Sequence, residues 1–196
     1  MIAGEGTCEV GHRVEGRLGV VEALLRRIAP AGWEVVDTIL WKHIHKFAGA
    51  GAGISPGQHG DFKNVLKLVL EAKRRSADVL AFVRDVDNED ARGDAVLGGL
   101  AKAKSDAKLP GGIVGGVARP VLEGWMLALL GRHNTDELRK AAALREMAER
   151  GYAKQAAAYV EIVDASDISR IPAGAQSLHD WLGDARSVFA PLDGER

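Results

Sequence analysis

Apolar residues along the chain fall into short runs, typical of strands, that alternate with longer periodic stretches, typical of helices. The clearest strand pattern covers residues 78–84, a nearly continuous apolar run that ends at Asp85. A run without polar alternation is typical of a parallel strand that is buried on both faces. Residues 33–40 and 111–118 are also predicted strands. Residues 1–3 form a first strand, so short that it leaves open whether the N-terminus is complete.

Helical periodicity follows each of these strands and then continues to the end of the chain. Pro120 is expected in the first turn of one helix, a position that tolerates proline because the first amides of a helix have no intrahelical partner. The predicted helices cover roughly residues 8–29, 62–70, 90–104, 120–130, 135–150, 152–163 and 175–188.

The alternation of strands and helices predicts an α/β fold, with a small, mainly parallel sheet of about four strands flanked by helices. We expect residues 1–132 to form this α/β domain. Residues 133–196 are expected to form a C-terminal helical section packed on the same domain.

Composition places the chain among ordinary globular proteins, with 46% hydrophobic and 27% charged residues in a length of 196. The formal net charge is -1, so a polyanionic partner would have to be held by a local basic patch or by metal. Cys8 is the single cysteine, which excludes an intrachain disulfide and favours a reducing compartment. No apolar run is long enough to span a bilayer, and acidic Glu5 and Glu9 do not resemble a signal peptide. We therefore expect a cytoplasmic protein.

Acidic residues follow two of the predicted strands. Glu5 follows the first strand, and Glu9 comes one helical turn later. Asp85 and Asp87 stand at the end of the strongest strand, where extended backbone would direct both side chains to one side. In parallel sheets, ligands bind outside the carboxyl ends of the strands. Oxygen ligands of this kind suit Mg²⁺, and one or two such ions support in-line displacement at phosphorus.

A simpler interpretation of the same acids remains open. Glu5 could cap the first helix, and Asp85, Asp87 and Asp90 could form a polar loop that leads into the next helix N-terminus. Acids at the ends of apolar strands are costly unless they have a function, which favours a site.

The order and spacing of these acids resemble a known family. Glu5-Gly6-Thr7-Cys8-Glu9 is similar to the Glu-Gly-x-x-Asp/Glu motif of the Toprim fold, and Asp85-Val86-Asp87 is similar to its Asp-x-Asp motif. The segments 119–127 and 152–157 resemble parts of small stand-alone bacterial Toprim-like proteins, akin to OLD-family and RloB-like nucleases. Two positions depart from the pattern, because Asp90 replaces a frequent glycine and Glu9 replaces the more usual aspartate.

The resemblance implies a nuclease that cleaves DNA or RNA with Mg²⁺ or Mn²⁺, often in phage defence and often beside a separate or fused ATPase. It implies that Glu5 is a metal ligand or general base and Glu9 a second acidic ligand, with Asp85 and Asp87 as metal ligands. A homodimer is compatible with this picture.

Two further residues are candidates for the same site. Glu123 lies on an apolar helix after the fourth strand, and a buried glutamate needs a partner or a metal. The alternative is an i, i+4 ion pair with Arg119 on the same helix. Lys154 could neutralise a transition-state phosphate, or it could simply be solvated.

A basic stretch could follow a phosphate backbone, or could be a solvated face. It includes Lys42, His43, His45 and Lys46, the glycine loop 49–60, and Lys63, Lys67, Lys73, Arg74 and Arg75. That loop lacks the Gly-Lys-Ser/Thr ending of a Walker motif, which argues against nucleotide hydrolysis.

Two other metal sites are disfavoured. Cys8 and His12 lack two more zinc ligands nearby, so core packing is the better interpretation of Cys8. Residues 85–96 start like a calcium loop but lack its glycine and its final glutamate.

Three functions therefore remain open. A metal-dependent nuclease is favoured. A non-catalytic module that binds a partner ATPase or nucleic acid is the main alternative, and a phosphatase or glycosyltransferase that uses the Asp-x-Asp pair is the third.

Overall fold

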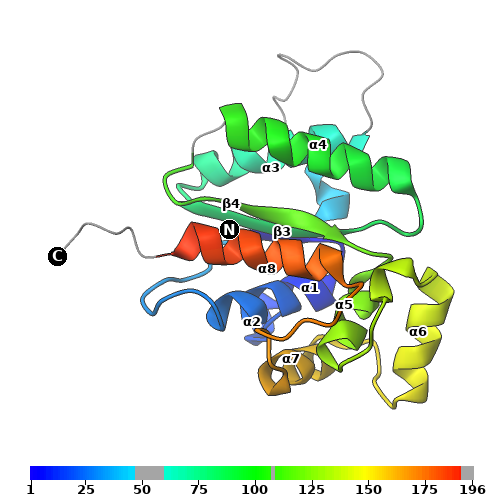
Figure 1. Ribbon diagram of the computed structural model, residues 1–196. Coiled ribbons are helices and arrows are strands. Elements are labelled where there is room, and N and C mark those ends of the chain that lie inside the picture. The colour runs from blue at the N-terminus through cyan, green and yellow to red at the C-terminus, as the bar shows by residue number, and fades with distance from the viewer. Residues whose placement is uncertain (47–59, 107–108, 191–196) are drawn as a thin grey trace.

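A computed structural model describes residues 1–46, 60–106 and 109–190 of the chain. Within these residues, four parallel strands form one sheet in the order β2-β1-β3-β4, with helices on both faces (Figure 1). This confirms the expected α/β architecture, a small parallel sheet flanked by helices. The strands are β1 (Ile2–Gly4), β2 (Thr38–Leu40), β3 (Val79–Asp85) and β4 (Gly112–Ala118).

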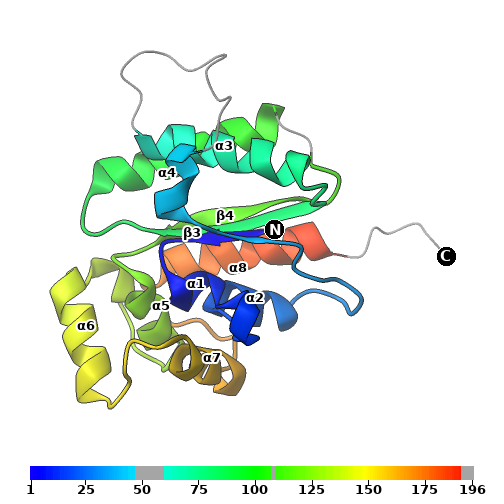
Figure 2. The ribbon, with the colours of Figure 1, turned by 180° about the vertical axis from the view of Figure 1, so that it is seen from behind.

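The helices surround this sheet in two groups. The α-helices are α1 (Thr7–Val10), α2 (Val20–Arg26), α3 (Gly60–Arg74), α4 (Asp90–Asp106), α5 (Leu122–Leu129), α6 (Lys140–Glu149), α7 (Ala156–Ala165) and α8 (Gln176–Phe189). The short 3₁₀ helices are η1 (Arg13–Glu15), η2 (Trp41–Lys46) and η3 (Thr135–Glu137). Helices α3 and α4 cover one face, and α1, α2, α5, α7 and α8 lie on the other (Figure 2).

The order of the strands creates a switch point between β1 and β3. From β1 the chain first crosses to β2 on one side, and then returns past β1 to β3 on the other side. Ile2 pairs with Thr38 of β2 and with Ala81 of β3. In such open sheets the crevice for a ligand lies outside the carboxyl ends of the strands at the switch point. A ligand is therefore expected to bind at the carboxyl ends of β1 and β3.

Side chains of β3 supply both halves of the core. Leu80 and Phe82 pack under α3 and α4, whereas Ala81 and Val83 face the helices of the other group. This alternation is the period of two expected for a strand buried on both faces. Gly115 of the neighbouring strand makes room for Phe82, since a Cβ there would lie 2.4 Å from the Phe82 ring.

The C-terminal helices pack on the sheet and on the helices beside it. Trp181 of α8 donates a hydrogen bond through Nε1 to the Phe82 carbonyl at 2.9 Å, and its ring contacts Trp125 of α5. Tyr159 and Val163 of α7 belong to the same buried cluster.

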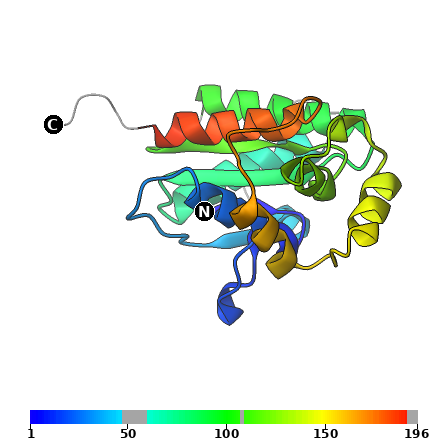
Figure 3. The ribbon, with the colours of Figure 1, turned by 60° about the horizontal axis from the view of Figure 1, so that its bottom comes forward.

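The predicted helix over 8–29 is wrong. The chain forms α1, η1 and α2 instead, and η1 projects from the molecule (Figure 3). Gly11 has a φ of 74°, and a Cβ there would lie 2.3 Å from the Arg17 carbonyl oxygen. The left-handed backbone at this glycine ends the helix and brings His12 and Arg17 into a short antiparallel bridge.

Several other boundaries differ from the predictions, and the helix predicted over 152–163 begins only at Ala156. Only residues 38–40 of the predicted strand over 33–40 pair in the sheet. Helix α5 begins at Leu122, two residues after Pro120, which follows a cis peptide bond. Residues 135–139 are not part of α6, which begins at Lys140. The glycine loop predicted over 49–60 lies outside the described residues, except for Gly60. Throughout the part of the chain that is described, no helix has the length and apolar character needed to cross a membrane.

Candidate active site

The first and third strands bring two of the predicted acids to the same edge of the sheet. Asp85 is the last residue of β3, and Glu5 follows directly after β1. The two strands are hydrogen-bonded neighbours, with Ala3 opposite Phe82. Both acids therefore stand at the carboxyl ends of the strands that flank the switch point.

Glu9 lies buried against the end of β1. Its Oε2 accepts a hydrogen bond from the Gly6 amide at 2.6 Å, so Glu9, and not Glu5, caps the first helix. A Cβ at Gly4 would lie 2.4 Å from the Glu9 Cβ, which shows why a glycine is needed there. Burial raises the pKa of Glu9, and the charge of Glu5 adds to this, although backbone amides and Lys154 oppose it.

Asp85 is also buried, 5% exposed, at the amino end of α5. Its Oδ1 accepts a hydrogen bond from the Leu122 amide at 2.9 Å. Burial raises the pKa of Asp85 well above its ordinary value, and repulsion from Glu9, Glu5 and Glu123 raises it further. These acids therefore lie close enough to oppose one another's ionisation.

Glu123, the second residue of α5, is the most completely buried acid of the group at 1% exposed. Its Oε1 accepts a hydrogen bond from the Tyr159 hydroxyl at 2.9 Å and pairs with Lys154 Nζ at 2.9 Å. Its Oε2 has no hydrogen-bond partner among the described residues. The alternative ion pair with Arg119 is wrong, because Arg119 precedes the helix and pairs with Asp90 at 2.9 Å.

Lys154 joins the acidic group from the segment before α7. Its side chain is 57% exposed, so it is partly solvated as well as paired with Glu123. Burial acts to lower the pKa of Lys154, but the hydrogen bond and charge of Glu123, with Asp85 and Glu9, outweigh it and raise the pKa. The ammonium group therefore stays charged beside the buried carboxylates.

Asp87 differs from Asp85 in both backbone and partners. Its φ of 56° places it in a left-handed turn after β3, so the expected extended geometry is wrong. Its Oδ2 accepts from Arg92 at 2.6 Å and its Oδ1 accepts from Lys140 at 2.6 Å. Burial acts to raise the pKa of Asp87, but Lys140 and Arg92 outweigh it and lower the pKa. Asp87 is a charged acid held by two cations, whereas Asp85 faces an amide.

The structure adds two arginines that the sequence analysis did not single out. Arg84 of β3 pairs with Glu5, lies over the Trp41 ring and approaches Asp61 at 3.7 Å. Arg92 of α4 reaches the other oxygen of Asp61 at 3.5 Å. Arg84 could have been recognised as a charge inside an otherwise apolar strand, but nothing in the local pattern marks Arg92.

The donor set fits a hard divalent cation in its chemistry. Glu9, Asp85 and Glu123 are buried carboxylates, which suit Mg²⁺ or Mn²⁺ better than a soft metal. The Oε2 atom of Glu123, which has no hydrogen-bond partner among the described residues, is a further oxygen that a cation would suit. Over residues 1–46, 60–106 and 109–190, however, no three His, Cys, Asp or Glu side chains converge closely enough to hold a metal. Glu5 and Asp87 each contact a cationic side chain instead.

Cys8 packs in the core, as expected. It is buried beside α2 and α7, whereas His12 lies beyond the end of α1, exposed, 3.7 Å from Glu15. Burial raises the pKa of Cys8 to about 11, with Glu9 contributing. The pair is not arranged as a zinc site.

Four residues of the predicted basic stretch lie on the surface, which agrees with contact to a phosphate backbone as well as with a solvated face. Lys42, His43, His45 and Lys46 of η2 are all exposed. Arg74 and Arg75 of α3 pair with Glu71, and Arg75 also pairs with Asp37 at 2.6 Å.

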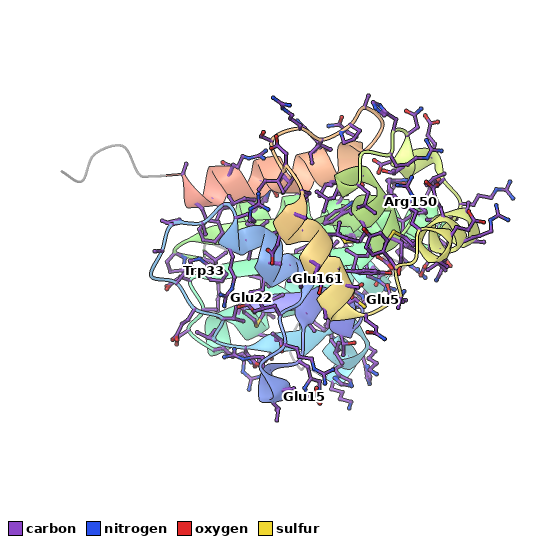
Figure 4. The ribbon with its side chains drawn as sticks, turned by 90° about the horizontal axis from the view of Figure 1, so that it is seen from below. Glu5, Glu15, Glu22, Trp33, Arg150 and Glu161 are labelled. Atoms are coloured by element: carbon purple, nitrogen blue, oxygen red, sulfur yellow. The ribbon has the colours of Figure 1, made fainter. Side chains whose placement is uncertain are left out.

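A hollow of about 640 Å³ lies away from these acids. Trp33, on its wall, lies toward the left in Figure 4, and Glu5 lies right of the centre. Two of its arginines are engaged by the protein, since Arg26 pairs with Glu22 and Arg13 donates to the Val35 carbonyl. The acids at the switch point are therefore the stronger candidate site.

Comparisons of the chain with protein-family models, with curated proteins and with solved structures found no match. The resemblance to the Toprim fold therefore stays a prediction from the motifs.

Proposed function

We propose that the protein is a divalent-metal-dependent nuclease of the Toprim type, which hydrolyses phosphodiester bonds of DNA or RNA with Mg²⁺ or Mn²⁺. The observation that carries the proposal is the group of buried carboxylates, Glu9, Asp85 and Glu123, at the switch point. Burying ionisable acids together is costly, and such groups persist mainly where they bind a cation or perform chemistry.

In this proposal, Asp85 and Glu9 would hold the metal together with Glu5 and Asp87, the acids of the two motifs. Glu5 and Asp87 would have to leave their contacts with Arg84 and Arg92 to do so. Glu123 is a further ligand or a base, since one of its oxygens is free of hydrogen bonds among the described residues. A bound Mg²⁺ or Mn²⁺ would activate water and stabilise charge on the attacking and leaving oxygens. Lys154, charged and half exposed, stands beside these acids and can neutralise a phosphate oxygen.

The proposal also concerns the setting of the protein. It places the protein in the cytoplasm, in a system of phage defence, and either as a homodimer or beside a separate ATPase. These points rest on the motif resemblance alone.

Nuclease assays on matched variants test the proposal. Supercoiled plasmid, linear DNA and RNA are incubated with the protein in Mn²⁺, in Mg²⁺ and in EDTA. We expect cleavage that needs divalent metal and is lost in Asp85→Asn, because Asp85 is the central buried acid. Asp94→Asn, which changes an exposed acid of α4, is the matched control and should cleave normally. Cleavage retained by folded Asp85→Asn would overturn the proposed site.

A second candidate function is a non-catalytic module that binds nucleic acid or a partner ATPase. It is favoured by the ion pairs of Glu5 with Arg84 and of Asp87 with Arg92, which compensate two of the predicted ligands without metal. Thermal unfolding with Mg²⁺ or Mn²⁺ separates the two functions, because a ligand that binds only the folded state raises its stability. An unchanged melting temperature at millimolar metal favours the module.

A phosphatase or glycosyltransferase is the third possibility. Release of phosphate from a small phosphomonoester, without cleavage of any polynucleotide, would support the phosphatase.

A further inference from the structure

Two arginines lie nearly buried beside the candidate site and share one acid behind them. The side chains of Arg84 and Arg92 are 12% and 16% exposed. Their Nε atoms lie 3.7 Å and 3.5 Å from the two carboxylate oxygens of Asp61. Asp61 is buried and accepts a hydrogen bond from Trp41 Nε1 at 2.7 Å. One acid thus fixes the inner ends of two guanidinium groups.

The outer ends of the two arginines contact the metal ligands named in the proposed function. Arg84 Nη1 contacts Glu5 Oε2, and Arg92 Nη1 contacts Asp87 Oδ2 at 2.6 Å. Glu5 follows β1 and Asp87 follows β3, so the two contacts stand on either side of the switch point. The arginines therefore supply positive charge at the two sides of the site.

This arrangement suits phosphate better than a purely structural role. A guanidinium presents a planar fork of donors that matches two oxygens of a phosphate, and an arginine fixed at its base loses little entropy on binding. Neither buried Nε makes a hydrogen bond to any described residue. The charge of Asp61 therefore attracts both guanidinium groups, but their Nε donors are left without a hydrogen-bond acceptor among the described residues. Arg92 makes a further contact with Glu89 at 3.0 Å, toward solvent.

We propose that Arg84 and Arg92 form the phosphate-binding pair for the substrate, and that they neutralise Glu5 and Asp87 while no divalent cation is bound. The inference rests on the proposed function, because it assigns these two acids to the metal. A cation that binds the acids displaces the guanidinium groups, which then bind a substrate phosphate. Metal and phosphate therefore favour each other's binding, and the coupling is reciprocal.

Calorimetric titration tests this coupling without relying on turnover. The probes are Mn²⁺ alone, thymidine 3′,5′-bisphosphate alone, and each in the presence of the other. In the wild-type protein we expect the nucleotide to bind about tenfold more tightly in Mn²⁺ than in EDTA, within the usual range of coupling between sites.

Removing one arginine should change the two affinities in opposite directions. In Arg92→Gln we expect Mn²⁺ to bind about tenfold more tightly, because a competing positive charge near the acids is worth at least the 1.4 kcal/mol that corresponds to tenfold. The same variant should bind the nucleotide about tenfold more weakly in Mn²⁺. Arg84→Gln should likewise bind Mn²⁺ more tightly and the nucleotide more weakly, because Arg84 contacts Glu5 as Arg92 contacts Asp87.

Two controls keep the experiment decisive. Arg145→Gln removes an exposed arginine of α6, 3.8 Å from Glu149, and should leave both affinities unchanged. If a glutamine variant does not fold, Arg92→Lys retains the charge but not the fork, and should keep Mn²⁺ affinity while losing nucleotide affinity.

Two other results would overturn the inference alone, and a third would also overturn the proposed function. Folded glutamine variants with wild-type affinities for Mn²⁺ and nucleotide would show that the arginines are structural, which overturns the inference and leaves the proposed function standing. Mn²⁺ binding by the wild type without coupling to the nucleotide has the same meaning. No Mn²⁺ binding by the wild type overturns both.

Discussion

Replacing Asp85 by asparagine should stabilise the metal-free protein. The asparagine can still accept the hydrogen bond from the Leu122 amide through its side-chain oxygen, so the contact with α5 is retained. The substitution removes a charge that is buried and that Glu9 and Glu123 repel. It therefore removes an unfavourable interaction and keeps a favourable one.

Two costs contribute to the magnitude: burial of the Asp85 charge, which is the larger, and repulsion from the acids around it. Two unit charges about 7 Å apart repel by about 2 kcal/mol at an effective dielectric constant of about 20. Lys154 offsets part of this, because its charge also acts on Asp85. A net gain of about 1–2 kcal/mol would raise the melting temperature by roughly 3–6 °C for a chain of this size.

The gain should depend on pH. The folded-state pKa of Asp85 is raised above its ordinary value of 3.8, so the folded protein binds the proton more tightly than the unfolded chain. The wild type therefore loses stability as the pH rises above about 4, until Asp85 is ionised in the folded state too. Asp85→Asn lacks this loss, so the difference in melting temperature should be absent near pH 3.5 and grow toward pH 8.

Melting temperatures by circular dichroism in EDTA, at half-unit steps of pH, measure this difference. Asp94→Asn, an exposed acid, is the control and should track the wild type. Addition of Mn²⁺ should reverse the order at pH 7.5, because the wild type gains a ligand and the variant does not. A variant less stable than the wild type at every pH would refute the reasoning that the buried charge of Asp85 destabilises the folded protein.

Three further predictions concern residues around the site and the sheet. Tyr159→Phe removes a hydrogen bond to Glu123 and should lower stability by about 1 kcal/mol in chemical denaturation, and an unchanged midpoint would contradict the role of that bond. Cys8, with a pKa raised to about 11 by burial, should resist iodoacetamide at pH 8 in the native protein and react in denaturant, as mass spectrometry can follow. Gly115→Ala should lower stability by about 1–3 kcal/mol, because a Cβ there meets the Phe82 ring at 2.4 Å. Gly183→Ala, inside α8 with open space around it, should instead raise stability by up to about 1 kcal/mol, because alanine favours a helix more than glycine does.

Local pattern was sufficient to predict much of the framework. The apolar run over 78–84 predicts β3 within one residue, and 111–118 predicts β4 equally well, since a strand buried on both faces needs a continuous apolar run. Where the pattern was ambiguous, tertiary contacts decided. The apolar spacing over 8–29 suits a helix, but Gly11, with its positive φ, divides it. Gly19 lets the returning chain pass close to the Glu9 backbone, because a Cβ at this position would lie 2.3 Å from the Glu9 carbonyl oxygen.

The candidate site shows the same division. Placement of Glu5 and Asp85 at one edge of the sheet follows from parallel strands, because their carboxyl ends meet there, and the sequence alone was enough to predict it. The partners of each acid were decided by the tertiary structure. Lys140 and Tyr159 come from helices far along the chain from the acids they contact, and contacts between distant segments have no periodic signature. Arg92 is only five residues from Asp87, and it reaches that acid across the left-handed turn that follows β3. Residue types thus determined which chemistry is available, and packing decided which acids are paired with cations and which lie buried beside one another.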